Sequence, residues 1–173
     1  MIALLSVMVL LLILDAYAFV VLHPFRWISL LYLLLLFVIY LVVKRFKISL
    51  FGFVFLALFV VFCNLGTLGL HSQYFIGIRF DRWVHALSGL VFGFVFYEVY
   101  NRKKVSNKVI LTIISVMIIG IIHEINEYFF VLSGLSYING SFLVGAFFDF
   151  YDSLMDLIYD FVGVLISLLF LRR

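Results

Sequence analysis

The sequence predicts an all-α integral membrane protein, a bundle of six transmembrane helices. Hydrophobic residues make up 67% of the 173 residues, and charged residues only 12%. A soluble globular domain is about half apolar and a quarter charged, so this composition excludes that class. The mean hydropathy is +1.30, and the apolar residues fall into six long runs separated by short polar breaks. Both observations indicate helices that lie in a bilayer.

Each apolar run is long enough to cross a membrane as one helix. At a rise of 1.5 Å per residue, about 20 residues match the thickness of the hydrocarbon layer. We therefore expect a single transmembrane domain over residues 1–173, with helices at about 2–22, 27–43, 48–70, 80–100, 109–131 and 150–171.

The basic residues are distributed unevenly among the breaks. In a chain of six spans, the second and fourth loops share one side with both termini. That side carries nine of the twelve basic residues: Lys44, Arg45, Lys47, Arg102, Lys103, Lys104, Lys108, Arg172 and Arg173. By the positive-inside rule both termini are cytoplasmic. We expect a multi-pass protein of the cytoplasmic (inner) membrane that contacts membrane lipids and binds no nucleic acid.

Most acidic residues fall inside the apolar runs instead of in the breaks. A carboxylate at the centre of a membrane helix costs roughly 2.5 to 3.5 kcal/mol, so these groups need partners, protons, a metal or water. Six polar residues lie roughly 6 to 10 Å below the outer ends of their helices at the α-helical rise. They are Asp15, Asn64, His85, Glu124, Glu127 and Asp156, with Asp81, Asp149 and Asp152 nearer the outside and Asp160 deeper.

Helical spacing places many of these side chains on shared faces. Residues three or four apart lie on one side of a helix. The sets with this spacing are Asp81 with His85, Glu124 with Glu127, and Asp152 with Asp156 and Asp160. Because lipid does not solvate such faces, we expect the three helices to turn them toward a cleft open to the outside. Gly89, Gly93 and Gly163 continue the stripes with small residues that permit close helix contact.

The residue types in this layer predict a divalent metal site. Carboxylates and imidazole bind Mg, Mn, Zn or Fe, and such an ion activates a bound water for attack on an ester or phosphate. The candidate ligands are His85, Glu124, Glu127, Asp152 and Asp156. Asp81 and His85 are the candidate catalytic residues, with Asp81 orienting His85 or acting as general base. The stringent motif His-Glu-x-x-His is absent from the sequence.

Each of these groups also has a purely structural interpretation, in which a polar partner satisfies it. The partners considered are His85 for Asp81; Asn64, Asn126, His123 or Arg82 for the two glutamates; and Arg79 or Arg82 for Asp152 and Asp156.

Three blocks of the sequence resemble a known family. They are Asp81-Arg-Trp-Val-His85-Ala-Leu-Ser-Gly89, Glu124-Ile-Asn-Glu127, and Asp149-Phe-Tyr-Asp152-Ser-Leu-Met-Asp156 with Gly163 beyond. In this order they resemble the YjdF-type inner-membrane proteins of bacteria and archaea over residues 74–171, and more distantly the VanZ-like membrane proteins. Tyr151 stands where that pattern usually has Trp, and Asp160 is not carried over. The resemblance implies a site at these residues and no particular reaction.

Three classes of function are compatible with the acidic layer. The first is a metal-dependent intramembrane hydrolase or transferase that acts on a lipid or lipid-linked substrate from the outer face. The second is a proton- or cation-coupled transporter or channel, because buried acidic chains serve both. The third is a non-catalytic accessory membrane protein whose acids pair with arginine. Clustering of the acids in the outer half favours the first class.

The predicted topology can be tested with reporter fusions. Fusions at Asn107 and Arg173 should behave as cytoplasmic and a fusion at Gly140 as external, because the basic residues follow the positive-inside rule. An external reporter at Arg173 would invert the predicted depth of every acidic residue.

Overall fold

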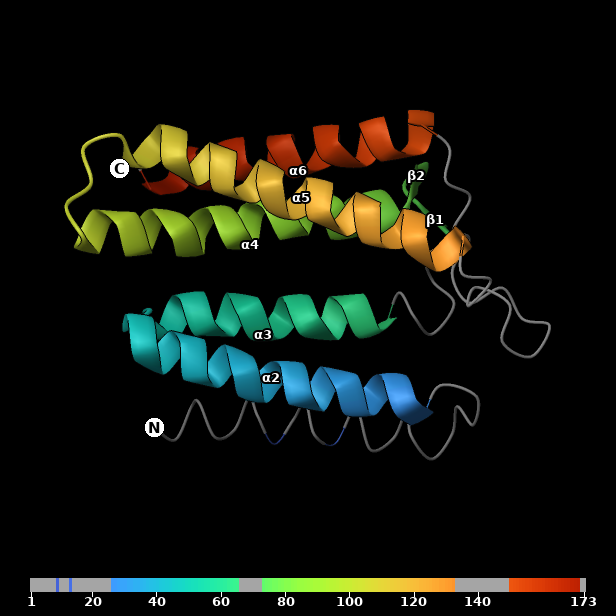
Figure 1. The fold of residues 1–173 in the computed structure, drawn as a ribbon, viewed down its shortest axis with the longest axis horizontal. Coiled ribbons are helices and arrows are strands. Elements are labelled where there is room, and N and C mark those ends of the chain that lie inside the picture. Colours follow the sequence, from blue (N-terminus) through green and yellow to red (C-terminus); the bar gives the residue numbers. More distant parts are fainter. Residues whose placement is uncertain (1–8, 10–12, 14–25, 66–72, 133–149, 172–173) are drawn as a thin grey trace. The chain divides into compact units, whose positions relative to one another are not determined.

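The computed structural model describes residues 9, 13, 26–65, 73–132 and 150–171. These residues form five helices and one short hairpin (Figure 1). The elements are α2 (Arg26–Phe46), α3 (Leu50–Leu65), β1 (Tyr74–Phe75), β2 (Ile78–Arg79), α4 (Phe80–Arg102), α5 (Lys108–Leu132) and α6 (Phe150–Leu171). The chain divides into two compact units, Met1–Leu68 and Gly69–Arg173.

The observed helices follow the apolar runs closely. α2, α4, α5 and α6 begin and end within three residues of the predicted bounds. α3 covers the first part of the predicted run 48–70, and residues 66–70 lie outside the described residues, as does the predicted helix 2–22 apart from two positions. Within the described part of the chain, α4, α6 and residues Lys108–Phe129 of α5 are long and apolar enough to cross a membrane.

A tight turn joins α2 to α3 in the first unit. Lys47 adopts a left-handed conformation with φ of 53°, and the Ile48 amide donates to the Val43 carbonyl at 3.0 Å. This arrangement closes the helix in the manner of a Schellman motif. The Ser49 hydroxyl then accepts a hydrogen bond from the Gly52 amide at 3.2 Å and caps the start of α3.

A two-residue hairpin precedes α4 in the second unit. Phe75 pairs with Ile78, and the turn between them has two consecutive positive φ angles, 55° at Ile76 and 75° at Gly77. Such angles match a type I′ turn, although a β-branched residue rarely adopts them. From the sequence this segment was expected only to be a break between helices, because two-residue strands show no periodicity. The hairpin places Arg79 directly before the first turn of α4.

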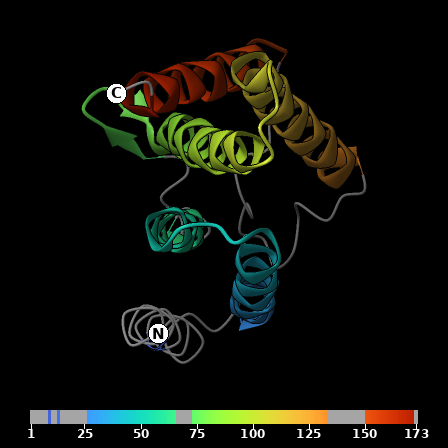
Figure 2. The ribbon, with the colours of Figure 1, turned by 90° about the vertical axis from the view of Figure 1, so that its left-hand side faces the viewer.

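α4, α5 and α6 form the bundle of the second unit, and α6 lies along α4 (Figures 1 and 2). Glycines allow this close approach. A Cβ atom at Gly89 would overlap the Asp160 carbonyl, and one at Gly163 would overlap the Ala86 carbonyl and lie 2.7 Å from the Leu90 amide nitrogen. The two backbones therefore touch, as small residues permit in membrane helices.

An apolar core fills the half of the bundle nearer the C-terminal end of α4. Val116, Val164 and Leu168 are buried there and pack against the aromatic rings of Phe92 and Phe96. The buried carboxylates lie toward the other end: Asp81 near the start of α4, Glu124 near the end of α5, Asp156 in the first half of α6 and Asp160 at its middle. The bundle is thus divided into an apolar half and a polar half.

The glycine contact predicts a large effect of one added methyl group. Gly163→Ala should destabilise the protein by about 1 to 3 kcal/mol or more, because the backbone of α4 must move to admit the Cβ. Val162→Ala on the exposed face of α6 is the control and should change stability by about 0.5 kcal/mol or less. Chemical denaturation in detergent measures both. Equal stability of the two variants would show that the helices do not pack this closely.

Candidate functional site

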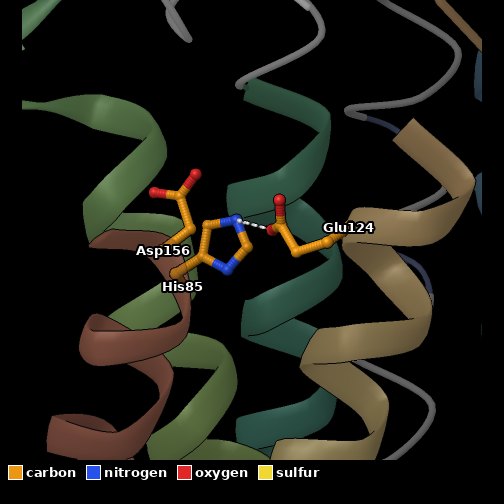
Figure 3. Close-up of side chains that lie close together, drawn as sticks. All are labelled: His85, Glu124 and Asp156. Carbon is orange, nitrogen blue, oxygen red and sulfur yellow. Dashed lines mark ion pairs between the residues drawn. The ribbon is translucent and has the colours of Figure 1, made fainter. Parts of the chain in front are cut away.

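Three helices bring His85, Glu124 and Asp156 together in the polar half of the bundle (Figure 3). Each offers one ligand atom, and these atoms lie within 4.8 Å of one another. The three residues are 3%, 6% and 2% exposed, respectively. His85 Nε2 lies 3.9 Å from Glu124 Oε1, which is too long for a hydrogen bond. We call these three residues the inner triad.

Several carboxylate oxygens around the inner triad have unmet hydrogen-bonding capacity. Among the described residues, Glu124 Oε1, Asp156 Oδ1 and Asp160 Oδ1 are buried without a hydrogen-bond partner. A buried polar atom left in this state costs about 1 to 3 kcal/mol, and more when it is charged. The site therefore has the ligand atoms that a cation would require.

The spacing of the inner triad fits a bound metal ion. Two ligand atoms at about 2.1 to 2.4 Å from one ion lie at most about 4.2 to 4.8 Å apart. The separation of 3.9 Å between His85 Nε2 and Glu124 Oε1 falls within this range, as does the limit of 4.8 Å for the whole triad. One imidazole and two carboxylates are ligands that Zn, Mn and Fe accept.

Asp81, Asp152 and Asp156 form a second acidic group at the mouth of the bundle, which we call the outer triad. Arg79 contacts two of its members. Arg79 Nη1 donates to both carboxylate oxygens of Asp152 at 2.7 Å, and Arg79 Nη2 lies 3.7 Å from Asp81 Oδ2. Arg82 Nη2 lies 3.6 Å from Asp152 Oδ1. The Arg79 guanidinium thus lies beside Asp152, where a metal ion would lie if Asp152 were a ligand.

Asp152 has one of the arginine partners that the structural interpretation named for it. Burial lowers the pKa of the Arg79 guanidinium, but the hydrogen bond and charge of Asp152 outweigh burial, so the pKa is raised. Arg79 therefore stays charged and compensates Asp152. Asp156 is the residue that the two triads share.

Glu127 lies apart from the inner triad. Its carboxylate oxygen is 3.4 Å from Nε2 of His123, and the two side chains are 32% and 54% exposed. Glu124, three residues earlier, is buried. The two glutamates are on one helix but differ in burial. His123, which lies beside Glu127, is one of the four partners that the structural interpretation named for the glutamates.

The role of Asp160 could not be assigned from the sequence. Asp160 is 1% exposed, and its Oδ2 lies 3.2 Å from Nδ1 of His85. Asp81 was expected to orient His85, and the hydrogen bond at Nδ1 of His85 is to the Asp160 carboxylate. The signal was its position four residues after Asp156 on the same face. Asp15 and Asp149 lie outside the described residues.

The ion pair of Arg79 and Asp152 should contribute measurably to stability. A double-mutant cycle with Arg79→Gln and Asp152→Asn should give a coupling energy of about 0.5 to 3 kcal/mol, since both groups are largely withdrawn from solvent. The pair of Glu98 and Arg102 is the control and should give about 0.2 to 1 kcal/mol, because Arg102 is 45% exposed. Equal coupling energies from denaturation in detergent would contradict a structural role for the first pair.

Comparison with known proteins identifies the family. Residues 2–173 match the family of predicted membrane proteins DUF2238. No curated protein and no solved structure matches the chain. The match covers nearly the whole sequence and agrees with the apolar helices described above. The chain therefore belongs to the DUF2238 family of membrane proteins.

Proposed function

We propose that this membrane protein binds a divalent cation between His85, Glu124 and Asp156. The observation that carries the proposal is the pair of buried oxygens, Glu124 Oε1 and Asp156 Oδ1, that have no hydrogen-bond partner among the described residues. The two residues lie in one group with the imidazole of His85, and each offers a ligand atom at separations that one ion can span. A cation would satisfy both oxygens at once.

The local charge balance supports the same proposal. Five carboxylates of the described residues lie in the polar half of the bundle, those of Asp81, Glu124, Asp152, Asp156 and Asp160. The guanidinium groups beside them are those of Arg79 and Arg82, and both contact Asp152. When several carboxylates lie close together in a low dielectric without cations, it is strongly unfavourable for all of them to be ionised at once. A divalent ion removes this penalty at the inner triad.

We further propose that the bound ion serves hydrolysis or group transfer on a lipid or lipid-linked substrate. The ion would activate a water or hydroxyl group. Asp81 belongs to the outer triad with Asp156 and is the candidate general base. In hydrolysis, Asp81 takes a proton from water as the oxygen bonds to the ester carbon or phosphorus, and then returns the proton to the departing alcohol. Lipids reach such a site directly from the bilayer.

The proposed orientation follows from the basic residues. Six spans with both termini cytoplasmic would place the N-terminal ends of α4 and α6 toward the outer face of the inner membrane. The two triads lie near these ends. The substrate would then approach from the outer leaflet.

A proton- or cation-coupled transporter is the second candidate. The observation that favours it is the stripe of Asp152, Asp156 and Asp160, which leads into the bundle along α6. Farther along, the buried polar side chains of the described residues are Thr112 and Ser167, and both hydroxyl groups donate to their own helix backbone. Because a conduction path needs further polar groups, this arrangement favours a site open at one end.

Metal content tests the proposal directly. Wild-type protein purified in detergent should retain a divalent metal, and Glu124→Gln and Asp156→Asn should each weaken its binding by more than about tenfold. Glu127→Gln is the matched control, since it makes the same change three residues away and outside the inner triad. Elemental analysis after dialysis measures the bound metal.

Thermal unfolding with and without EDTA distinguishes a metal site from a structural ion pair. Saturating metal at about 100 times its Kd should stabilise the wild type by about 2.7 kcal/mol, and EDTA should remove this gain. Asp156→Asn should unfold independently of EDTA and no earlier than the EDTA-treated wild type, because it relieves repulsion among carboxylates. A wild type insensitive to EDTA, together with a strongly destabilised Asp156→Asn, would refute the metal site.

A further inference from the structure

Asp160 on α6 contacts His85 on α4 in the polar half of the bundle. Its side chain is fully buried, and the hydrogen bond joins its Oδ2 to Nδ1 of His85 at 3.2 Å. The other ring nitrogen, Nε2, lies on the side of Glu124, 3.9 Å from Oε1 (Figure 3). The two nitrogens of one imidazole therefore have different environments.

For a neutral ring beside an ionised Asp160, this difference selects one tautomer of the imidazole. A carboxylate only accepts hydrogen bonds, so the nitrogen beside Asp160 carries the proton. A neutral imidazole has one N–H group, and its second nitrogen then offers a lone pair. With the proton on Nδ1, the lone pair of His85 is on Nε2, toward Glu124. Histidine ligands of metals commonly have a carboxylate partner of this kind.

We infer that Asp160 is a positioning residue, which holds the His85 ring so that Nε2 is presented to a divalent cation in the inner triad. The inference rests on the proposed metal site and adds a residue to it. Asp160 itself is not a ligand in this scheme. It acts through the hydrogen bond to His85.

Packing holds the Asp160 carboxylate in place. A Cβ atom at Gly120 on α5 would lie 2.6 Å from Asp160 Oδ2, and a Cβ atom at Gly89 on α4 would overlap the Asp160 carbonyl oxygen. Two glycines on two helices thus leave the space that this residue occupies. The ring of His123, with its centroid 5.3 Å from that of His85, packs nearby.

The nitrogen that binds the ion can be identified in the wild-type protein. In protein labelled with ¹⁵N-histidine and loaded with ¹¹³Cd²⁺, NMR in detergent should show coupling of cadmium to Nε2 of His85, while Nδ1 keeps its proton. His85→Gln assigns the signals. Coupling to Nδ1 would overturn the inference, and the coupling itself is measured in the wild-type protein with Asp160 unchanged.

Variants then test the role of Asp160. Titration with Co²⁺ should show about 10- to 100-fold weaker binding and an altered visible spectrum for Asp160→Asn. Gly120→Ala keeps the carboxylate but crowds Oδ2 of Asp160. It should change the Co²⁺ affinity and the visible spectrum in the same direction as Asp160→Asn. Asp152→Asn is the matched control, with the same change on the same helix at a carboxylate bound to Arg79. It should keep the wild-type spectrum.

The outcomes separate this inference from the proposed function. Wild-type affinity and spectrum in Asp160→Asn would overturn the positioning role while the metal site stands. A wild-type protein that binds neither Co²⁺ nor Cd²⁺ would refute the metal site itself, and the inference with it. A purely structural Asp160 predicts lower stability but an unchanged spectrum in the folded fraction, which also contradicts the inference.

Discussion

The close contact between α4 and α6 determines the geometry of the site. Gly89 faces the backbone of Asp160, and Gly163 faces the backbone of Ala86, so the two helices meet without intervening side chains. At this separation His85 on α4 reaches the carboxylate of Asp160 on α6. Larger residues at either glycine would push the helices apart and remove His85 from the acidic stripe. The polar cluster therefore depends on an apolar feature, the absence of two Cβ atoms.

The acidic residues are compensated differently at different depths. At the mouth, Arg79 and Arg82 contact Asp152, and these cations come from the hairpin and the first turn of α4. Deeper in the bundle, Glu124 and Asp156 keep buried oxygens without hydrogen-bond partners among the described residues. Long arginine side chains reach the mouth from its edge, whereas a small ion can enter deeper. The arginine ion pair thus lies at the mouth, and the oxygens of the proposed metal site lie deeper.

The histidine and the two glutamates on α5 illustrate how the rotation of a helix about its own axis decides which side chains are buried. Glu124 turns into the bundle, while His123 and Glu127 pair with each other on a more exposed side. These residues are three and four positions apart, and this spacing does not show which of them faces the bundle. Contact with α4 and α6 decides which carboxylate is buried, and therefore which one is a candidate ligand.

The sequence by itself determined the membrane class and the bounds of α2, α4, α5 and α6, and it named the three residues that the structure brings together in the inner triad. Helix length follows from apolar runs, and the steps of four from Asp152 to Asp160 place three carboxylates on one face, because both depend only on the local helix. Tertiary structure alone decided the partners. Arg79 pairs with Asp152, and the hydrogen bond at Nδ1 of His85 is to Asp160. These choices depend on the separation and rotation of neighbouring helices, which glycine contacts set and which periodicity within one helix does not encode.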